Sequence, residues 1–126
     1  MRPLWVSCII LVGLFFVLQW NVQYLEAFVN PLHDKLLEAE ACVEEDDWET
    51  AMQLTKEVHE TWKGKQFYLH VTLRHSDIDQ VTVLLEQAMA YIEHKKIGEY
   101  AAVNKAIIGQ MELLIEMESL TLRNVL

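Results

Sequence analysis

A chain of 126 residues with a formal net charge of −9 is too short for two domains with separate cores. Its acidity argues against nucleic-acid binding, because phosphate backbones are bound by clustered lysines and arginines. Only two prolines and four glycines occur. Such a shortage of turn-forming residues is typical of an all-helical chain with short connections.

The first part of the chain is an apolar segment without a charge between Arg2 and Glu26. A helix needs about 20 mostly apolar residues to cross a hydrocarbon core of about 30 Å. We therefore expect residues 1–25 to be a transmembrane signal-anchor, with residues 4–25 in the lipid bilayer. Residues 26–126 are then expected to form one helical domain outside the bilayer.

Two alternatives to an uncleaved anchor, a cleaved signal peptide and a lipid-modified cysteine, are disfavoured by the sequence. A cleaved signal peptide needs small residues at the cleavage site, but Leu25 lies two positions before Ala27, the first plausible small residue. A lipid-modified Cys8 is disfavoured because the region before it is too short. Aromatic residues with a polar edge lie at both ends of the segment, as they do at membrane interfaces: Trp5, Trp20 and Tyr24.

The charges on either side of the segment predict its orientation. Arg2 and the α-amino group precede it, whereas the next charged residues are mostly acidic: Glu26, Asp34, Lys35, Glu38 and Glu40. Lysine and arginine near the ends of a span favour the cytoplasmic side. We expect the N-terminus to be cytoplasmic and the domain to lie at the outer face of the cell membrane.

Four amphipathic segments follow and predict an antiparallel four-helix bundle made of two helical hairpins. They cover residues 32–45, 47–63, 76–96 and 98–122. Apolar residues recur in each at the i, i+3, i+4, i+7 spacing of a buried helix face.

The ends of these segments follow from their capping residues. Asn30–Pro31 predicts the start of the first helix, and Pro31 favours a break or a kink after the apolar segment. Gly64 predicts the end of the second helix, as its C′ residue. Residues 65–75 are apolar and β-prone but have no partner strand, so they are expected to be further helix or an apolar connection.

An internal similarity supports the two hairpins. Residues 41–48 align with residues 90–97, and each block reads as a helix end, a short charged turn and a new helix start. The identities are few, so duplication and convergence on one hairpin design both remain open.

Residues 44–49 hold five acids in six positions. The pattern lacks the regular oxygen donors and the glycine of a calcium loop, so a turn followed by a helix N-terminus is favoured. Trp48 and Trp62 lie fourteen residues apart on nearly one helix face. Core packing is favoured for this pair over an aromatic ligand groove.

The five histidines form no HExxH pair, and the two cysteines, Cys8 and Cys42, form no CxxC pair. His75 and Asp79 are four residues apart and could share a helix face, which is more often a solvated or capping pair than a metal or acid–base site. Cys42 is expected to be buried and unreactive. We assign no catalytic, cofactor-binding or metal-binding residue and no cofactor, and an enzyme is not expected.

Taken together, several motifs resemble a group of short bacterial proteins known only as a domain of unknown function (four-three-six-three). The motifs are Asp47–Trp48, Trp62, His75–Asp79, Ala90–Glu93, Leu114–Glu118 and Leu122–Val125. The resemblance covers the whole chain and implies a single N-terminal span followed by a helical domain. It implies no activity, ligand or catalytic residue.

The expected function is a membrane-anchored interaction or scaffold module. Its partners are expected to be the lipid bilayer and a membrane or cell-envelope protein, and no nucleic acid. The alternative is a ligand- or cation-binding accessory domain of the cell envelope.

Overall fold

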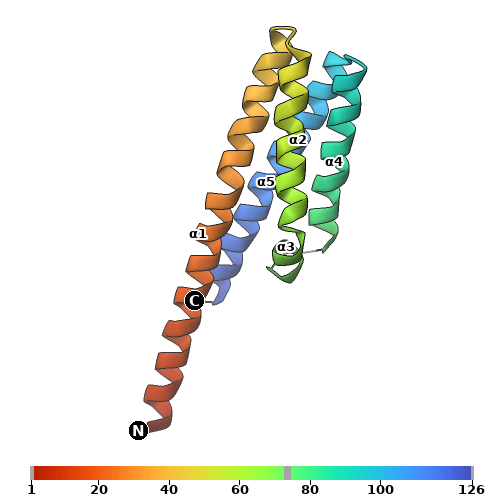
Figure 1. The fold of residues 1–126 in the computed structure, drawn as a ribbon. Helices are drawn as coiled ribbons and strands as arrows, with labels where there is room; N and C mark the ends of the chain where they lie inside the picture. The colour runs from red at the N-terminus through yellow and green to blue at the C-terminus, as the bar shows by residue number, and fades with distance from the viewer. Residues whose placement is uncertain (1, 73–74, 126) are drawn as a thin grey trace.

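The computed structural model describes the backbone of residues 2–72 and 75–125 and the side chains of residues 2–69 and 76–120. The described residues form helices and no strand, which confirms the all-α prediction. In chain order the helices are α1 (Arg2–Glu44), α2 (Trp48–Gly64), α3 (Gln66–Thr72), α4 (His75–Glu93) and α5 (Ile97–Val125). The long helices alternate in direction, and α1 extends well beyond the others at its N-terminal end (Figure 1).

The four long helices share one apolar core. α1 packs against α2 and α5, α4 packs against the same two helices, and α3 packs against α2 and α4. The largest fully buried side chains include Trp62, Tyr100, Leu36 and Leu85, one from each long helix. This arrangement is a helical bundle in which α3 closes the end from which the N-terminal part of α1 projects (Figure 1).

The N-terminal part of α1 is exposed and apolar. Among the described residues, α1 is the one helix long and apolar enough to cross a membrane, with a mean hydropathy of 2.0 over a window in which no residue is buried. A signal sequence near the N-terminus also meets this criterion. The first buried residue of α1 is Val22, followed by Leu25 at 1 % exposure. The helix therefore passes from a fully exposed apolar stretch into the core of the bundle.

Pro31 lies inside α1, so the predicted helix start at Asn30–Pro31 is wrong, and of the break or kink that Pro31 favours, the break does not occur. A proline in a helix interior costs about 3 kcal/mol, because it removes one hydrogen bond and its ring crowds the preceding turn. Val29 and Leu32 flank Pro31 and are almost fully buried in the same core. Burying two such side chains contributes about 1.5–3 kcal/mol each, which outweighs the cost of the proline and holds the helix together.

The other predicted helices are confirmed to within three residues at each end. In the uncertain stretch 65–75, α3 accounts for residues 66–72, and residues 73–74 lie outside the described part of the chain. α2 ends at Gly64, as predicted, but Gly64 is still helical and no described glycine has a positive φ. The prediction that Gly64 is a C′ residue is therefore wrong.

The two hairpin turns have the same hydrogen bonds. In the first, the N–H of Asp46 donates to Val43 O at 3.0 Å and that of Asp47 donates to Cys42 O at 2.7 Å. In the second, the N–H of Lys95 donates to Ile92 O at 3.0 Å and that of Lys96 donates to Tyr91 O at 2.8 Å. These bond pairs define a Schellman cap, whose C′ residue is left-handed. Asp46 and Lys95 accordingly have φ values of 65° and 53°.

The equivalence of the hairpins extends along the helices. Buried residues of the first hairpin recur as buried residues 49 positions later: Val29 and Ile78, Leu32 and Val81, Leu36 and Leu85, Ala39 and Ala88, Val43 and Ile92, Ala51 and Tyr100, Thr55 and Asn104, Val58 and Ile107, Trp62 and Met111. Two hairpins with the same spacing of buried side chains thus form one core. The apolar stretch at the start of α1 is an addition to the first hairpin.

Two equivalent positions, Thr55 and Asn104, place polar side chains in this core. Asn104 Nδ2 donates to the backbone oxygen of Leu36 at 3.2 Å, and Thr55 Oγ1 donates to that of Ala51 at 2.9 Å. Burial raises the pKa of Tyr100, and the negative charge of Glu40 adds to this effect. Because Asn104 joins α5 to α1, a shift of one helix along the other would leave its amide buried without this partner.

We expect Lys95→Gly to stabilise the bundle. A residue with a Cβ pays about 1–2 kcal/mol in the left-handed conformation, and glycine does not. Chemical denaturation of the full chain in detergent, followed by circular dichroism, should show a gain of about 0.5–1 kcal/mol after the entropy cost of glycine is subtracted. Glu93→Gly, at the last helical residue of α4, is the control and should destabilise. An equal loss in both variants would contradict the role assigned to Lys95.

Candidate functional site at the α3 end of the bundle

The two hairpins differ where α2 gives way to α3. α2 stops at Gly64 and Lys65 caps it, whereas α5 continues without interruption through the equivalent positions, Leu113 and Leu114. Of the α3 side chains, Leu69 is fully buried but Phe67 is 85 % exposed. The break in α2 therefore gives rise to a separate short helix, α3, at this end of the bundle (Figure 1).

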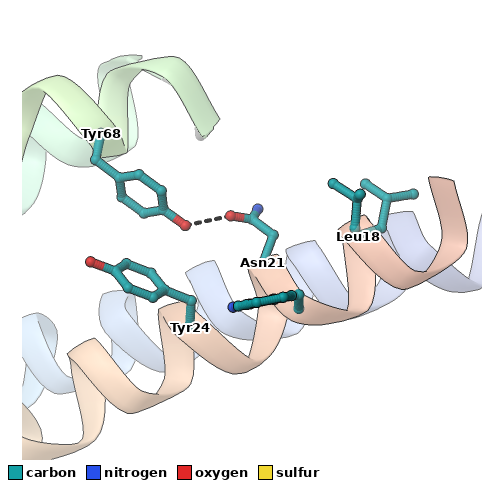
Figure 2. Close-up of a pocket in the computed structure, with 6 residues that line it drawn as sticks. Leu18, Asn21, Tyr24 and Tyr68 are labelled. Atoms are coloured by element: carbon teal, nitrogen blue, oxygen red, sulfur yellow. Dashed lines mark hydrogen bonds between the residues drawn. The ribbon is translucent and has the colours of Figure 1, made fainter. Parts of the chain in front are cut away.

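A cluster of polar and aromatic residues ties α3 to α1. We call it the tyrosine cluster, and it consists of Asn21, Tyr24, Lys65 and Tyr68. The Tyr68 hydroxyl donates to Asn21 Oδ1 (Figure 2), and Lys65 Nζ donates to the Tyr24 hydroxyl at 3.2 Å. The two tyrosine rings meet edge to face, with centroids 5.0 Å apart and planes at 64°. These contacts fix the position of α3 along α1.

Glu118 on α5 completes the surroundings of this cluster. Burial raises the pKa of Tyr68, and Tyr24 and Glu118 add to the effect. Burial also raises the pKa of the Glu118 carboxyl. Groups with shifted pKa values that gather at one place are candidates for a functional site. Here the two groups are Tyr68 on α3 and Glu118 on α5, which interact at one end of the bundle.

An apolar groove of about 520 Å³ opens beside the cluster. It is lined by Val17, Leu18, Trp20, Asn21, Tyr24 and Tyr68. In Figure 2 the Tyr68 and Asn21 side chains point toward each other, and Leu18 lies further toward the N-terminus of α1. The groove thus bridges the exposed apolar stretch and the first buried turns of α1.

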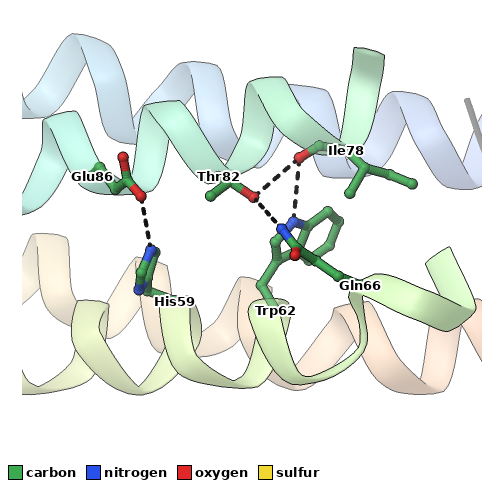
Figure 3. Close-up of polar contacts among 6 residues, drawn as sticks. All are labelled: His59, Trp62, Gln66, Ile78, Thr82 and Glu86. Atoms are coloured by element: carbon green, nitrogen blue, oxygen red, sulfur yellow. Dashed lines mark hydrogen bonds and ion pairs between the residues drawn. The ribbon is translucent and has the colours of Figure 1, made fainter. Parts of the chain in front are cut away.

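Next to this end, polar contacts join α2 and α3 to α4 (Figure 3). Trp62 Nε1 donates to Ile78 O at 3.4 Å, and Gln66 Nε2 donates to Thr82 Oγ1 at 3.4 Å. The Trp62 ring is fully buried and stacks on Phe28 at a centroid distance of 6.1 Å. The favoured interpretation of Trp62 as a core residue is confirmed, and the aromatic ligand groove is not formed by it.

The acidic run from Glu44 to Glu49 forms the turn between α1 and α2. Asp47 Oδ1 accepts a hydrogen bond from Thr50 N at 3.2 Å and caps α2, and Asp46 Oδ1 accepts one from Trp48 Nε1 at 2.7 Å. Trp48 is half-buried against the core. The turn and helix start predicted for these acids are confirmed.

The histidines whose side chains the structure describes, His33, His59 and His94, do not converge. His33 Nε2 lies 3.3 Å from Glu112 on α5, and His59 Nε2 lies 3.4 Å from Glu86 on α4. The proposed pairing of His75 with Asp79 falls on a side chain outside those that the structure describes. Within the described part of the chain, no group of three or more His, Cys, Asp or Glu residues is placed to hold a metal ion.

Cys8 and Cys42 are both free thiols, the first exposed and the second half-buried. Burial raises the pKa of the Cys42 thiol, and the acids Asp47, Glu38 and Glu45 add to the effect. A thiol held in its protonated form is a poor nucleophile. Cys42 is therefore less buried than predicted but still placed for low reactivity.

Sequence reasoning missed the tyrosine cluster. Asn21 and Tyr24 were assigned to the membrane segment, and Lys65 and Tyr68 fell in the stretch of uncertain structure. One signal was available: residues 61–76 contain three basic residues and no acid, in a chain of net charge −9.

The fold defines a class: a helical bundle whose first helix is extended by an apolar stretch long enough to cross a membrane. The chain belongs to the family described as Domain of unknown function (DUF4363), whose model matches residues 19–125. The match begins three residues before Val22, the first buried residue of α1, so it covers the bundle and little of the exposed apolar stretch. No curated protein and no solved structure matches the chain.

We expect Glu118→Gln to stabilise the bundle at pH 7 but not at pH 4. A carboxyl whose pKa is raised on folding contributes fully below its unfolded pKa and loses that contribution as the pH rises through the folded pKa. The neutral amide avoids this loss. Thermal melting of the full chain at both pH values checks the prediction. Glu116→Gln, on an exposed part of the same helix, is the control and should leave the melting temperature unchanged. An equal effect of Glu118→Gln at both pH values would contradict the prediction.

Proposed function

We propose that the protein is a membrane-anchored, non-enzymatic interaction or scaffold module. α1 crosses the cytoplasmic membrane, and an antiparallel four-helix bundle of two hairpins stands at its outer face. The observation that carries the proposal is the continuity of α1, which enters the core of the bundle without a break. A flexible tether would only hold a domain near the membrane, whereas a continuous helix also orients it.

The dimensions of α1 support the anchor. At 1.5 Å per residue, residues 4–25 extend over about 32 Å, which matches a hydrocarbon core of about 30 Å. Large apolar side chains on all sides of this stretch are exposed, among them Leu4, Ile9, Phe16 and Val17. A surface of this kind is unstable in water and favourable in lipid.

The charge distribution supports the orientation. Arg2 is the one charged side chain before the apolar stretch, and Glu26 and Asp34 are the first acids after it. A basic N-terminus favours the cytoplasmic side. The acidic bundle is then placed outside.

A groove between α1 and α5 supports a protein partner. Its volume is about 480 Å³, and it is lined by Leu37, Glu40, Ala101, Ala102, Lys105 and Ile108. Leu37 is 45 % exposed, and the two alanines leave room for close approach. One helix of a membrane or envelope protein, with its own apolar face, is the partner that this groove fits. Glu40 and Lys105 can each pair with an opposite charge at its edges.

The alternative, a cation-binding accessory domain, gains no support from the described residues. The acids of the first turn are used in capping and in the bond to Trp48. The interaction module is therefore the function that we put forward.

Labelling of intact cells tests the anchor and its orientation. In a Cys8→Ala/Cys42→Ala background, Glu45→Cys at the distal turn should react with a membrane-impermeant maleimide before lysis. The protein should also stay in the membrane after alkaline carbonate extraction. Labelling only after lysis would reverse the orientation, and release by carbonate would contradict the anchor.

Photo-cross-linking tests the partner. A photoreactive residue at Ala102 should give one discrete adduct with another protein in native membranes. The matched control is Gln53 on α2, which lies on a polar surface and should give none. Equal cross-linking at both positions, or at neither, would contradict the assignment of the groove as the contact surface.

A further inference from the structure

The most basic stretch of the chain lies at the end of the bundle from which the apolar part of α1 projects. Residues 61–76 carry Lys63, Lys65 and Arg74 and no acid, although the whole chain has a net charge of −9. Lys63 and Lys65 are exposed where α2 meets α3. Segments that bind anionic lipid headgroups typically have cationic residues beside an apolar surface.

The tyrosine cluster sets the depth of α3 relative to α1. Tyr68 and Lys65 contact Asn21 and Tyr24, which follow Leu4 by 17 and 20 residues. At 1.5 Å per residue these contacts lie about 26–30 Å from Leu4 along the helix axis. A hydrocarbon core of about 30 Å that begins at Leu4 ends at this level. α3 therefore lies at the membrane–water interface whenever α1 spans the bilayer.

Phe67 is a strongly exposed aromatic side chain that adds nothing to the core of the bundle. It is 85 % exposed, and the equivalent position in the second hairpin is a glutamate, Glu116. The core does not need an aromatic residue there. An exposed phenylalanine at interface depth, next to lysines, gains free energy when it enters the boundary between headgroups and acyl chains.

We propose that α3 is a second membrane contact, which binds the surface of the bilayer that α1 crosses. Phe67 inserts among the lipid headgroups, and Lys63 and Lys65 bind anionic phosphates there. The apolar groove beside the tyrosine cluster then faces lipid. This inference rests on the proposed anchoring by α1 and adds to it a second point of attachment, which restrains rotation of the bundle about the axis of α1.

Spin labelling of the full chain in vesicles of phosphatidylcholine and phosphatidylglycerol tests the proposal. Three single-label proteins are compared: native Cys8 in a Cys42→Ala background, and Phe67→Cys and Glu45→Cys in a Cys8→Ala/Cys42→Ala background. For each label, collisions with oxygen and with a water-soluble nickel chelate are measured. We expect the label at position 8 to be fully shielded from nickel, the label at 67 to be shielded severalfold relative to 45, and the label at 45 to be fully accessible.

The possible outcomes separate the two proposals. A label at 67 that is as accessible to nickel as the one at 45, with position 8 shielded, overturns the α3 contact and leaves the anchor intact. A label at 8 as accessible as the one at 45 overturns both. Shielding at 67 and at 8 supports both, because Phe67 is exposed in the bundle and no other protein is present.

A second comparison tests the role of charge. Vesicles of phosphatidylcholine alone, or Lys63→Gln in mixed vesicles, should reduce the shielding at position 67. Lys56→Gln, in the middle of α2, is the matched control and should leave it unchanged. Equal shielding with and without anionic lipid would overturn the assignment of Lys63 to the headgroups.

Discussion

Every other feature of the structure depends on the burial of one face of α1 from Val22 onward. The helix exposes its apolar surface on all sides before that point and buries a single stripe afterwards, through Leu25, Val29, Leu32 and Leu36. This stripe forms part of the core, and its burial outweighs the cost of Pro31. Because the same helix serves both parts, the bundle cannot fold without fixing the direction in which the apolar stretch leaves it.

Much of the fold follows from sequence periodicity. The apolar spacing of the helices after the first hairpin turn is regular, and their ends are marked by acids and by short charged turns, so they were predicted closely. The helix start predicted at Pro31 is wrong because the prediction used only the local preference against proline within a helix. The burial of Val29 and Leu32 in the core outweighs that local preference. Such contacts are between helices and leave no local pattern in the sequence.

The site at the α3 end was not predictable in the same way. The tyrosine cluster joins residues 41 to 47 positions apart, and nothing near Tyr24 or Asn21 in the sequence indicates Lys65 or Tyr68. Capping residues are recognisable because their partners are neighbours. By contrast, the equivalence of the hairpins was visible in residues 41–48 and 90–97, and the structure extends it to nine pairs of buried positions. Thr55 and Asn104 are one of these pairs, so the spacing of 49 residues also relates the two buried polar residues of the core.

Because α1 is one unbroken helix, a tilt of its N-terminal part also tilts the bundle. From Leu25 to Glu44 the helix rises about 28 Å at 1.5 Å per residue. With α1 spanning a bilayer as proposed, a change in tilt of about 20°, which is within the range that spanning helices adopt as bilayers change thickness, would swing the acidic tip at Glu45 and Asp46 sideways by about 10 Å. A small adjustment in the lipid is thereby converted into a displacement as wide as a helix at the far end of the molecule.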